Sequence, residues 1–430
     1  MLERLMQQAE RAEVFEIQSE ATKIGFEANK LKSFEVEETQ GIAARVVADG
    51  RLGFAASSDV TAVDQLIENV LASAQLGDEI PLHFPEPQPG PSVDVYNSEL
   101  AALPASQLIE IGREMVKTIV DADEEANVSI DLTRRVRETT LRNTAGTEVA
   151  VRKAPLSIML EVERVRGDDV VTLFEYFNTT TLDDGYRAFV DRVAEKLRLA
   201  QRVATLSSER MSVLFTPTGA PILSLPLIHG LNGKNVYRGI SPMTGQEEER
   251  IFDEKLTVMD DPTLDGRPGS SPHDDEGVPR RRNVLIDQGR LMGYIYDLKT
   301  AALARAEPTG NGERSLFSPP SPSFSNMVVA NGETPVGDIV AGIDKGLLVE
   351  TPLGLGQGNV ISGAFSNNLS LAFKIERGEI VGRVKDVSVA GNIYQDLRDI
   401  EALSLESEWV YGGIRLPYIL LPRLNVVTKN

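Results

Sequence analysis

His229 is the first residue with a potential role in chemistry, and it lies in residues 217–233, with the sequence PTGAPILSLPLIHGLNG. The centre of this segment predicts a short buried helix that carries His229 near its C-terminal end. A catalytic zinc ion takes about three protein ligands and keeps one position open. The chain has three histidines and no cysteine, and the five residues before His229 supply no further ligand. His229 alone therefore fits a helix end, near the last carbonyls, better than a zinc site or a general base.

An acidic cluster of Asp274, Asp275 and Glu276 is the second candidate. It could hold a metal ion or act as an acid–base pair, but it lacks the alternating spacing of an EF-hand calcium loop. Adjacent side chains of an extended loop point to opposite sides, so neighbours seldom share a proton. The simpler prediction is a turn whose carboxylates bond backbone amides or pair with the arginines at residues 280–282. The cluster stays a candidate contact for a substrate or a partner.

Glycine-rich loops form the third group of candidates, at Gly310, Asn311 and Gly312 and at residues 354–358 (GLGQG). Neither loop connects a strand to a helix in a βαβ unit, and neither ends in the Gly-Lys-Ser/Thr of a phosphate-binding loop. Such glycines suit the close approach of another chain or a peptide. A G-x-S-x-G motif is absent too, so the residues by themselves contain no convincing catalytic set.

The composition narrows the class of protein. With 430 residues the chain exceeds one hydrophobic core, which predicts two domains. The net charge of −20 is spread along the chain and disfavours binding to nucleic acid, whose affinity rests on lysine and arginine. The absence of cysteine excludes disulfides, thiolate zinc sites and cysteine nucleophiles. We expect no cofactor, no membrane span, and a cytoplasmic location, because the N-terminus is charged and lacks an apolar signal core.

The elements that position these residues predict an α+β fold, with strands and helices mixed and no regular βαβ repeat. A first domain, residues 1–208, is expected to hold a mixed antiparallel sheet with helices at about residues 63–74, from 106 onward, and 184–203. Asp49-Gly50 predicts a hairpin turn, and Ser57, Ser58 or Asp59 a helix cap. Strands are expected at residues 14–19, 22–29, 33–39, 41–48, 51–56, 128–134, 138–142, 148–152, 157–165 and 170–177.

A second domain, residues 209–430, reads as rich in strands, beginning with the apolar run at residues 211–215. Short helices are predicted at residues 298–305, 334–345 and 393–403. Further strands are predicted at residues 347–350, 369–375, 380–387 and 408–421.

Several motifs of the second domain, in this order and spacing, resemble the TldD/PmbA family. They are DDPTLDG (260–266), DDEGVP (274–279), VLIDQGRLMGY (284–294), PTGNG (308–312), SGAFS (362–366) and VAGN (389–392). The strand–hairpin–helix opening of the first domain is similar as well, so the resemblance covers almost the whole chain. It implies a metalloprotease-like second domain.

The resemblance also implies which branch of the family this chain follows. TldD-type members resemble zinc metalloproteases with an H-E-x-x-x-H segment and a C-terminal cysteine ligand. In register with that segment, Ser224 takes the place of the first histidine, Leu225 that of the glutamate and His229 that of the second histidine. Leucine cannot activate a zinc-bound water. The chain therefore looks like the PmbA/TldE branch, with no catalytic residues and no metal of its own.

For function, the resemblance implies a non-catalytic, cytoplasmic subunit of a complex with a TldD-type zinc protease that degrades or processes unfolded peptides. Two alternatives stay open. One is a self-sufficient homodimeric peptidase that uses His229 with Asp274 or Glu276. The other is a protein that binds and modulates DNA gyrase directly.

Overall fold

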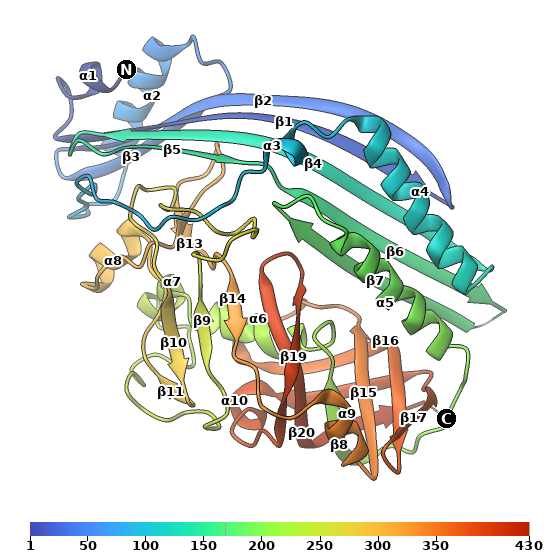
Figure 1. Ribbon diagram of the computed structural model, residues 1–430. Coiled ribbons are helices and arrows are strands. Elements are labelled where there is room, and N and C mark those ends of the chain that lie inside the picture. Colours follow the sequence, from blue (N-terminus) through green and yellow to red (C-terminus); the bar gives the residue numbers. More distant parts are fainter. Residues whose placement is uncertain (168, 430) are drawn as a thin grey trace.

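A computed structural model describes residues 1–167 and 169–429 of the chain (Figure 1). It contains two large sheets, one built from residues 11–179 and the other from residues 209–428, with helices packed against both. The predicted α+β class is therefore confirmed.

The first sheet is antiparallel, with strand order β3-β2-β1-β4-β6-β7 and with β5 paired to β4. Residues 156–164 of β6 alternate between buried and half-buried positions, because successive side chains of a strand point to opposite faces and one face covers a core. The strands are β1 (Arg11–Glu27), β2 (Lys30–Ala48), β3 (Arg51–Ser57), β4 (Ala126–Asn143), β5 (Glu148–Lys153), β6 (Leu156–Arg166) and β7 (Asp169–Thr179).

Helices cover opposite ends of this sheet. α2 (Val63–Gln75) packs on β2 and β3, while α4 (Ala105–Ala122) and α5 (Gly185–Leu199) lie side by side at the other end (Figure 1). Both α2 and α4 have apolar residues at helical spacing, and these residues are the buried ones. Short helices are α1 (Leu2–Leu5) and α3 (Ser98–Ala101).

The second sheet has eleven strands and contains a closed barrel. Its main path is β11-β10-β9-β14-β20-β18-β16-β15-β8, and β8 also pairs with β20, which closes β8, β15, β16, β18 and β20 into a ring. The strands are β8 (Glu209–Phe215), β9 (Val258–Asp260), β10 (Asn283–Asp287), β11 (Arg290–Leu291), β14 (Met327–Val329), β15 (Lys345–Pro352), β16 (Ala364–Glu376), β17 (Glu379–Arg383), β18 (Val387–Asn392), β19 (Ala402–Val410) and β20 (Ile414–Thr428).

The remaining elements of this half are short. A two-stranded ribbon joins β12 (Gly312–Glu313) and β13 (Ser321–Pro322). The helices are α6 (Pro221–Gly230), α7 (Gly233–Tyr237), α8 (Leu298–Ala304), η1 (Val360–Ser362), α9 (Val336–Ala341) and α10 (Ile393–Asp396). One core cluster joins α4 and α5 to strands of both sheets, so the two halves pack together through apolar side chains.

Several expected boundaries are wrong. The first hairpin turns at Ala28 and Asn29, both with positive φ, rather than at residues 30–32. Residues 408–421 form two strands, because the chain reverses at Tyr411 and Gly412 with φ of 48° and 83°. The cap expected for α2 is also wrong: Ala62 stands at that position, and Asp59 instead accepts hydrogen bonds from Thr61.

Two helices in the second half of the chain are shorter than predicted. α9 ends at Ala341 instead of continuing to residue 345, and α10 ends at Asp396 instead of near residue 403. Apolar residues beyond both helices belong to the core through loops and strands, so their spacing mimics a longer helix. None of the helices in the described chain combines the length and apolar character needed to cross a membrane.

Candidate functional site

The candidate site is built around α6, which follows β8 directly. Thr216 donates its backbone N–H to the Val349 carbonyl of β15, 3.0 Å away, and this bond directs the chain into the helix. A Cβ atom at Gly219 would lie 2.2 Å from the same carbonyl oxygen, so a glycine is required there. Pro221 begins the helix, where its missing N–H costs nothing.

α6 is apolar on nearly every side, as its sequence predicts. Such a helix is stable only inside a core, and seven of its ten residues are buried. Ile222, Leu223 and Leu227 pack against apolar residues of the barrel strands. Pro226 lies inside the helix, where it removes one backbone hydrogen bond. Tyr394 approaches this turn and donates its hydroxyl hydrogen bond toward the carbonyls of Pro226, 3.3 Å away, and Ile361, 3.1 Å away.

The three positions that correspond to a zinc motif differ in their exposure to solvent. Ser224 is 2% exposed, and its Oγ has no hydrogen-bond partner among the described residues. Leu225 is half-buried, and His229 is exposed at the end of the helix. The Ser224 hydroxyl is thus enclosed in the core, whereas the His229 ring is exposed to solvent.

These residues do not fit a zinc ion. One of the three positions carries a leucine, which has no donor atom, and the other two face different surroundings. In residues 1–167 and 169–429, no three histidine, cysteine or acidic side chains are grouped closely enough to hold a metal. The Asn235 side chain donates to the backbone carbonyl of His229, 2.8 Å away, so an asparagine rather than the histidine ring caps this helix end.

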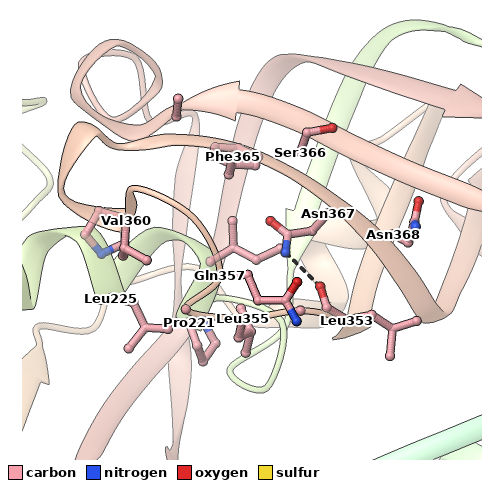
Figure 2. Close-up of a pocket in the computed structure, with 15 residues that line it drawn as sticks. Pro221, Leu225, Leu353, Leu355, Gln357, Val360, Phe365, Ser366, Asn367 and Asn368 are labelled. Atoms are coloured by element: carbon pink, nitrogen blue, oxygen red, sulfur yellow. Dashed lines mark hydrogen bonds between the residues drawn. The ribbon is translucent and has the colours of Figure 1, made fainter.

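A groove of about 380 Å³ lies beside α6 (Figure 2). One wall is α6 itself, with Pro221 and Leu225, and the others are residues 353–360 and the start of β16. Figure 2 shows Leu225, Val360, Gln357 and Asn367 around this space, with Asn367 hydrogen-bonded to the Leu353 carbonyl at 2.8 Å. Leu225, at the position of a catalytic glutamate in the motif, therefore lines the groove.

The groove also contains an open strand edge. Residues 364–368 of β16 pair with β18 on one side, while β15 reaches only from Leu369 onward on the other side. The connection after β15 bonds this edge once through the backbone, where Leu353 donates to the Asn368 carbonyl at 2.8 Å. The side chains of Ala364, Ser366 and Asn368 are exposed. An unpaired edge of this kind can accept an extended peptide as an added strand.

The glycine loop at residues 354–358 forms another wall of the groove. Gly356 and Gly358 have φ of 77° and 75°, a conformation that most side chains avoid, and a Cβ atom on either would meet no neighbour. The backbone is therefore accessible here. The glycine loop is the sequence motif that indicated close backbone approach at this groove. The lining by Pro221, Val360 and Asn367 was not predicted.

The acidic cluster lies elsewhere and is mostly buried. Asp274 and Glu276 are 4% and 0% exposed. Asp274 accepts backbone hydrogen bonds from Glu276, Val278 and Gly312, each at 2.9 Å, so it organises a turn. Burial raises the pKa of Asp274 to about 6.

Glu276 belongs to a buried charge network that joins the two halves of the chain. Arg45 of β2 binds Glu13 of β1 through two nitrogen–oxygen contacts of 3.0 and 2.8 Å, and binds Glu276 at 2.6 Å. Arg314 binds Glu13 from the other side at 2.6 Å. Burial raises the pKa of Glu276 to about 8 against the attraction of Arg45, whereas the charges of Arg314 and Arg45 outweigh burial and lower the pKa of Glu13.

The bonds expected from this turn to backbone amides are present at Asp274, whereas the alternative, a pairing of the acids with residues 280–282, is wrong. No ion pair joins the two groups in the described part of the chain: Glu276 pairs with Arg45, and the Asp275 side chain accepts the backbone N–H of Arg314 at 3.1 Å. Arg280 is buried beside a different cavity. Asp275 lines that cavity too, but forms no ion pair with Arg280 in the described part of the chain.

The second glycine motif also has a structural environment. Asn311 is fully buried and donates its side-chain N–H to Asp260, 2.6 Å away. Gly310 has a φ of 76°, and Gly312 lies against the Glu276 side chain, 2.3 Å from where a Cβ atom would be. The structure thus brings the acidic cluster and this loop together, but not with α6. Their use in substrate or partner contact stays a prediction.

Comparisons with known proteins agree with this geometry. The family model described as the PmbA/TldA metallopeptidase C-terminal domain matches residues 208–428, just over half the chain, and the model for PmbA/TldA metallopeptidase domain 1 matches residues 12–74. The solved structure of TldE from Thermococcus kodakarensis is 26% identical, with a TM-score of 0.91 over 99% of this chain and 98% of that one.

Two curated relatives show how the similarity is distributed. A metalloprotease TldD homologue from Haemophilus influenzae is 34% identical over 43% of this chain, and the match spans only 38% of that protein. An uncharacterized protein from Methanocaldococcus jannaschii is 26% identical over 97% of this chain and 98% of its own length. The similarity to the TldD homologue is thus confined to part of each protein.

Proposed function

Because the chain belongs to the PmbA/TldD family, we propose that it is a PmbA/TldE-like subunit that lacks catalytic zinc and acts with a TldD-type zinc protease. The complex degrades or processes unfolded peptides in the cytoplasm. The partner supplies the metal and the base, and this chain contributes a surface that holds the substrate.

The observation that carries this proposal is the donor set of α6. A zinc hydrolase needs ligands and a group that activates the bound water. Here the base position is Leu225 and the first ligand position is Ser224, whose side chain is buried. Leu225 cannot activate a zinc-bound water as a glutamate would, and Ser224 cannot bind zinc as a histidine would.

The groove beside α6 supports the substrate-holding role. The edge of β16 at residues 364–368 and the accessible backbone of residues 354–358 offer main-chain groups to an extended chain. Hydrogen bonds to a peptide backbone give affinity with little dependence on side chains. Such a site suits a protease complex whose substrates are unfolded.

The experiment compares this chain alone, a TldD-type subunit alone and an equimolar mixture. We expect no stoichiometric zinc in this chain by elemental analysis, and cleavage of an unfolded peptide well above the sum of the separate proteins only in the mixture. Tight zinc binding together with peptide cleavage by this chain alone would overturn the proposal.

A groove variant tests the role of this chain within the complex. Leu225→Arg places a long charged side chain in the groove, so we expect the mixture to lose at least about tenfold in activity while the variant still folds. Leu76→Arg is the matched control, because Leu76 is 91% exposed and far from the groove in sequence. Equal activity of both variants would remove the groove from the proposal.

Neither alternative gains support from the geometry. A self-sufficient homodimeric peptidase would use His229 with Asp274 or Glu276, but both acids are buried and already hydrogen-bonded. For direct binding to DNA gyrase, no surface feature points to that partner. Pull-down of gyrase in the absence of a TldD-type subunit would favour that alternative.

A further inference from the structure

A second cavity, of about 200 Å³, lies where the first sheet meets the long loop of the second half. Four basic side chains line it: Arg135 and Arg137 of β4, Lys153 of β5, and Arg280 of the loop. This concentration of positive charge is unexpected in a chain with a net charge of −20. No known function of the α6 groove uses these residues.

The strand register forces like charges together. Arg137 and Lys153 stand directly opposite each other in the antiparallel β4–β5 pair, and Arg135 is two residues along the same face of β4. Like charges directly opposite on a sheet are destabilising. An acidic side chain in place of Arg137 or Lys153 would remove the repulsion between them. A bound anion would have the same effect.

Arg280 completes the cluster from the other half of the molecule. Its side chain is 8% exposed, and its buried Nη1 has no hydrogen-bond partner among the described residues, while Nε donates to the His273 carbonyl at 3.3 Å. The buried Nε of Arg137 is unpartnered in the same way. A buried donor without an acceptor is unfavourable, and a ligand could supply the acceptor that both groups lack.

The acids nearby form no close ion pair with the cluster among the described residues. Asp275 and Glu313 line the same cavity, yet neither lies within 4.0 Å of a basic nitrogen of these four residues in the described chain. Asp275 instead accepts the Arg314 backbone N–H. Lys153 donates only to the Pro268 carbonyl, at 3.0 Å. Asp260 and Asp274 attract Arg280 and Glu37 attracts Arg135 without forming ion pairs in residues 1–167 and 169–429, so the positive charge of the cluster is only partly offset.

The pKa of Lys153 is lowered in this group of positive charges. Burial and the positive charge of Arg280 lower its pKa to about 7, and Arg137 acts in the same direction, while Asp275 and Glu313 oppose them more weakly. An anion in the cavity would favour the charged form of the lysine.

We infer that this cavity binds a carboxylate group of a peptide, through the guanidinium groups of Arg137 and Arg280 and the ammonium group of Lys153. Arginine forks match the two oxygens of a carboxylate, and the charge-assisted bonds are stronger than neutral ones. The volume is below the roughly 300–1,000 Å³ typical of sites for whole small molecules, so it suits one end or one side chain of a longer ligand. The choice of a peptide rests on the proposed function.

Calorimetric titration of the full chain tests the inference with three short peptides: N-acetyl-Ala-Ala-Ala with a free carboxylate, its C-terminal amide, and N-acetyl-Ala-Glu-Ala amide. We expect one of the two carboxylate-bearing peptides to bind at least about tenfold more tightly than the neutral amide, which also tells whether the C-terminus or an acidic side chain is recognised. Equal binding of all three, or binding of inorganic phosphate with no binding of either carboxylate peptide, overturns the inference.

Variants tie the binding to this cavity. Arg280→Gln and Arg137→Gln should each weaken the preferred peptide at least about tenfold, with thermal melting as the check on folding. Arg152→Gln is the matched control, because Arg152 adjoins Lys153 on β5 but lies over the Tyr96 ring, 4.4 Å from its centroid, outside the cavity. Unchanged affinity in both cavity variants refutes the site. Because binding is measured without a protease, failure here leaves the partner-dependent cleavage test untouched.

Discussion

Arg45→Met is the most informative change that can be made to the junction between the two halves of the chain. The Arg45 guanidinium is 1% exposed and contacts carboxylates of both halves, Glu13 at 3.0 and 2.8 Å and Glu276 at 2.6 Å. Methionine keeps an apolar stem and removes the guanidinium group, with its charge, its hydrogen bonds and its contact 5.3 Å from the centre of the Phe84 ring.

The loss of folding stability expected for Arg45→Met follows from the contacts that Glu13 and Glu276 lose. Glu13 keeps Arg314 at 2.6 Å, but Glu276 keeps only the backbone N–H of Leu298 at 2.7 Å. Burial raises the pKa of Glu276 to about 8, so the measurement is made at pH 9, where removing one partner of a buried ion pair costs about 3–5 kcal/mol because a charge is left uncompensated. That loss is a large share of the roughly 5–15 kcal/mol that stabilises a typical folded protein.

Urea unfolding followed by fluorescence and circular dichroism measures this loss. Trp409, the only tryptophan, lies in β19 with the Arg267 guanidinium 3.9 Å from its ring, so its emission reports on the second half, and coincident curves from both probes would justify a two-state treatment. Arg113→Met is the control, because the pair of Arg113 with Glu110 is exposed and worth less than about 1 kcal/mol.

A second substitution separates the ion pair from other effects. In Arg45→Met with Glu276→Gln, no uncompensated charge remains at Glu276, so the combined loss should fall short of the sum of the single losses by at least about 1 kcal/mol. A loss for Arg45→Met no larger than that for Arg113→Met would refute the reasoning that this network stabilises the junction.

Three further predictions concern single residues. His229→Ala should leave cleavage by the mixture with a TldD-type subunit within about twofold of wild type, since the exposed ring has no catalytic partner; loss of activity would favour the homodimeric peptidase. Gly219→Ala should cost about 2 kcal/mol or more in urea unfolding, because its Cβ would lie 2.2 Å from the Val349 carbonyl oxygen, whereas Gly337→Ala, with open space around it, should not. Lys153 has a pKa of about 7 in the folded chain, so between pH 7 and 9 the unfolded chain binds more protons than the folded chain and the free energy of unfolding rises with pH. Lys153→Met should reduce this rise by about 2 kcal/mol. An unchanged rise would contradict the lowered pKa.

Local patterns in the sequence were sufficient to predict much of the fold. Alternation along residues 157–165 and helical spacing along residues 63–74 predicted β6 and α2, because both periodicities follow from which side chains face a core. Pattern failed where apolar residues continued through a turn, as at Tyr411, or beyond a helix, as after Ala341. The boundary between residues 208 and 209 stays a prediction.

Residue types alone support several conclusions about this chain. An α+β fold, a chain without cysteine, and a motif with Ser224 and Leu225 at ligand and base positions can be read from the chain alone. A reaction that needs an absent donor atom is excluded by the sequence alone, so the lack of zinc ligands in α6 can be recognised without a structure.

Which of the remaining residues contact one another depends on the three-dimensional fold. Arg45 pairs with Glu276 across 231 positions of sequence, and the arginine expected beside Glu276 lines another cavity. The facing of Arg137 and Lys153 depends on the strand register, since a slip of one residue would turn each side chain to the opposite face. Such contacts are set by how sheets and loops pack over long distances, and no local pattern in the chain encodes them.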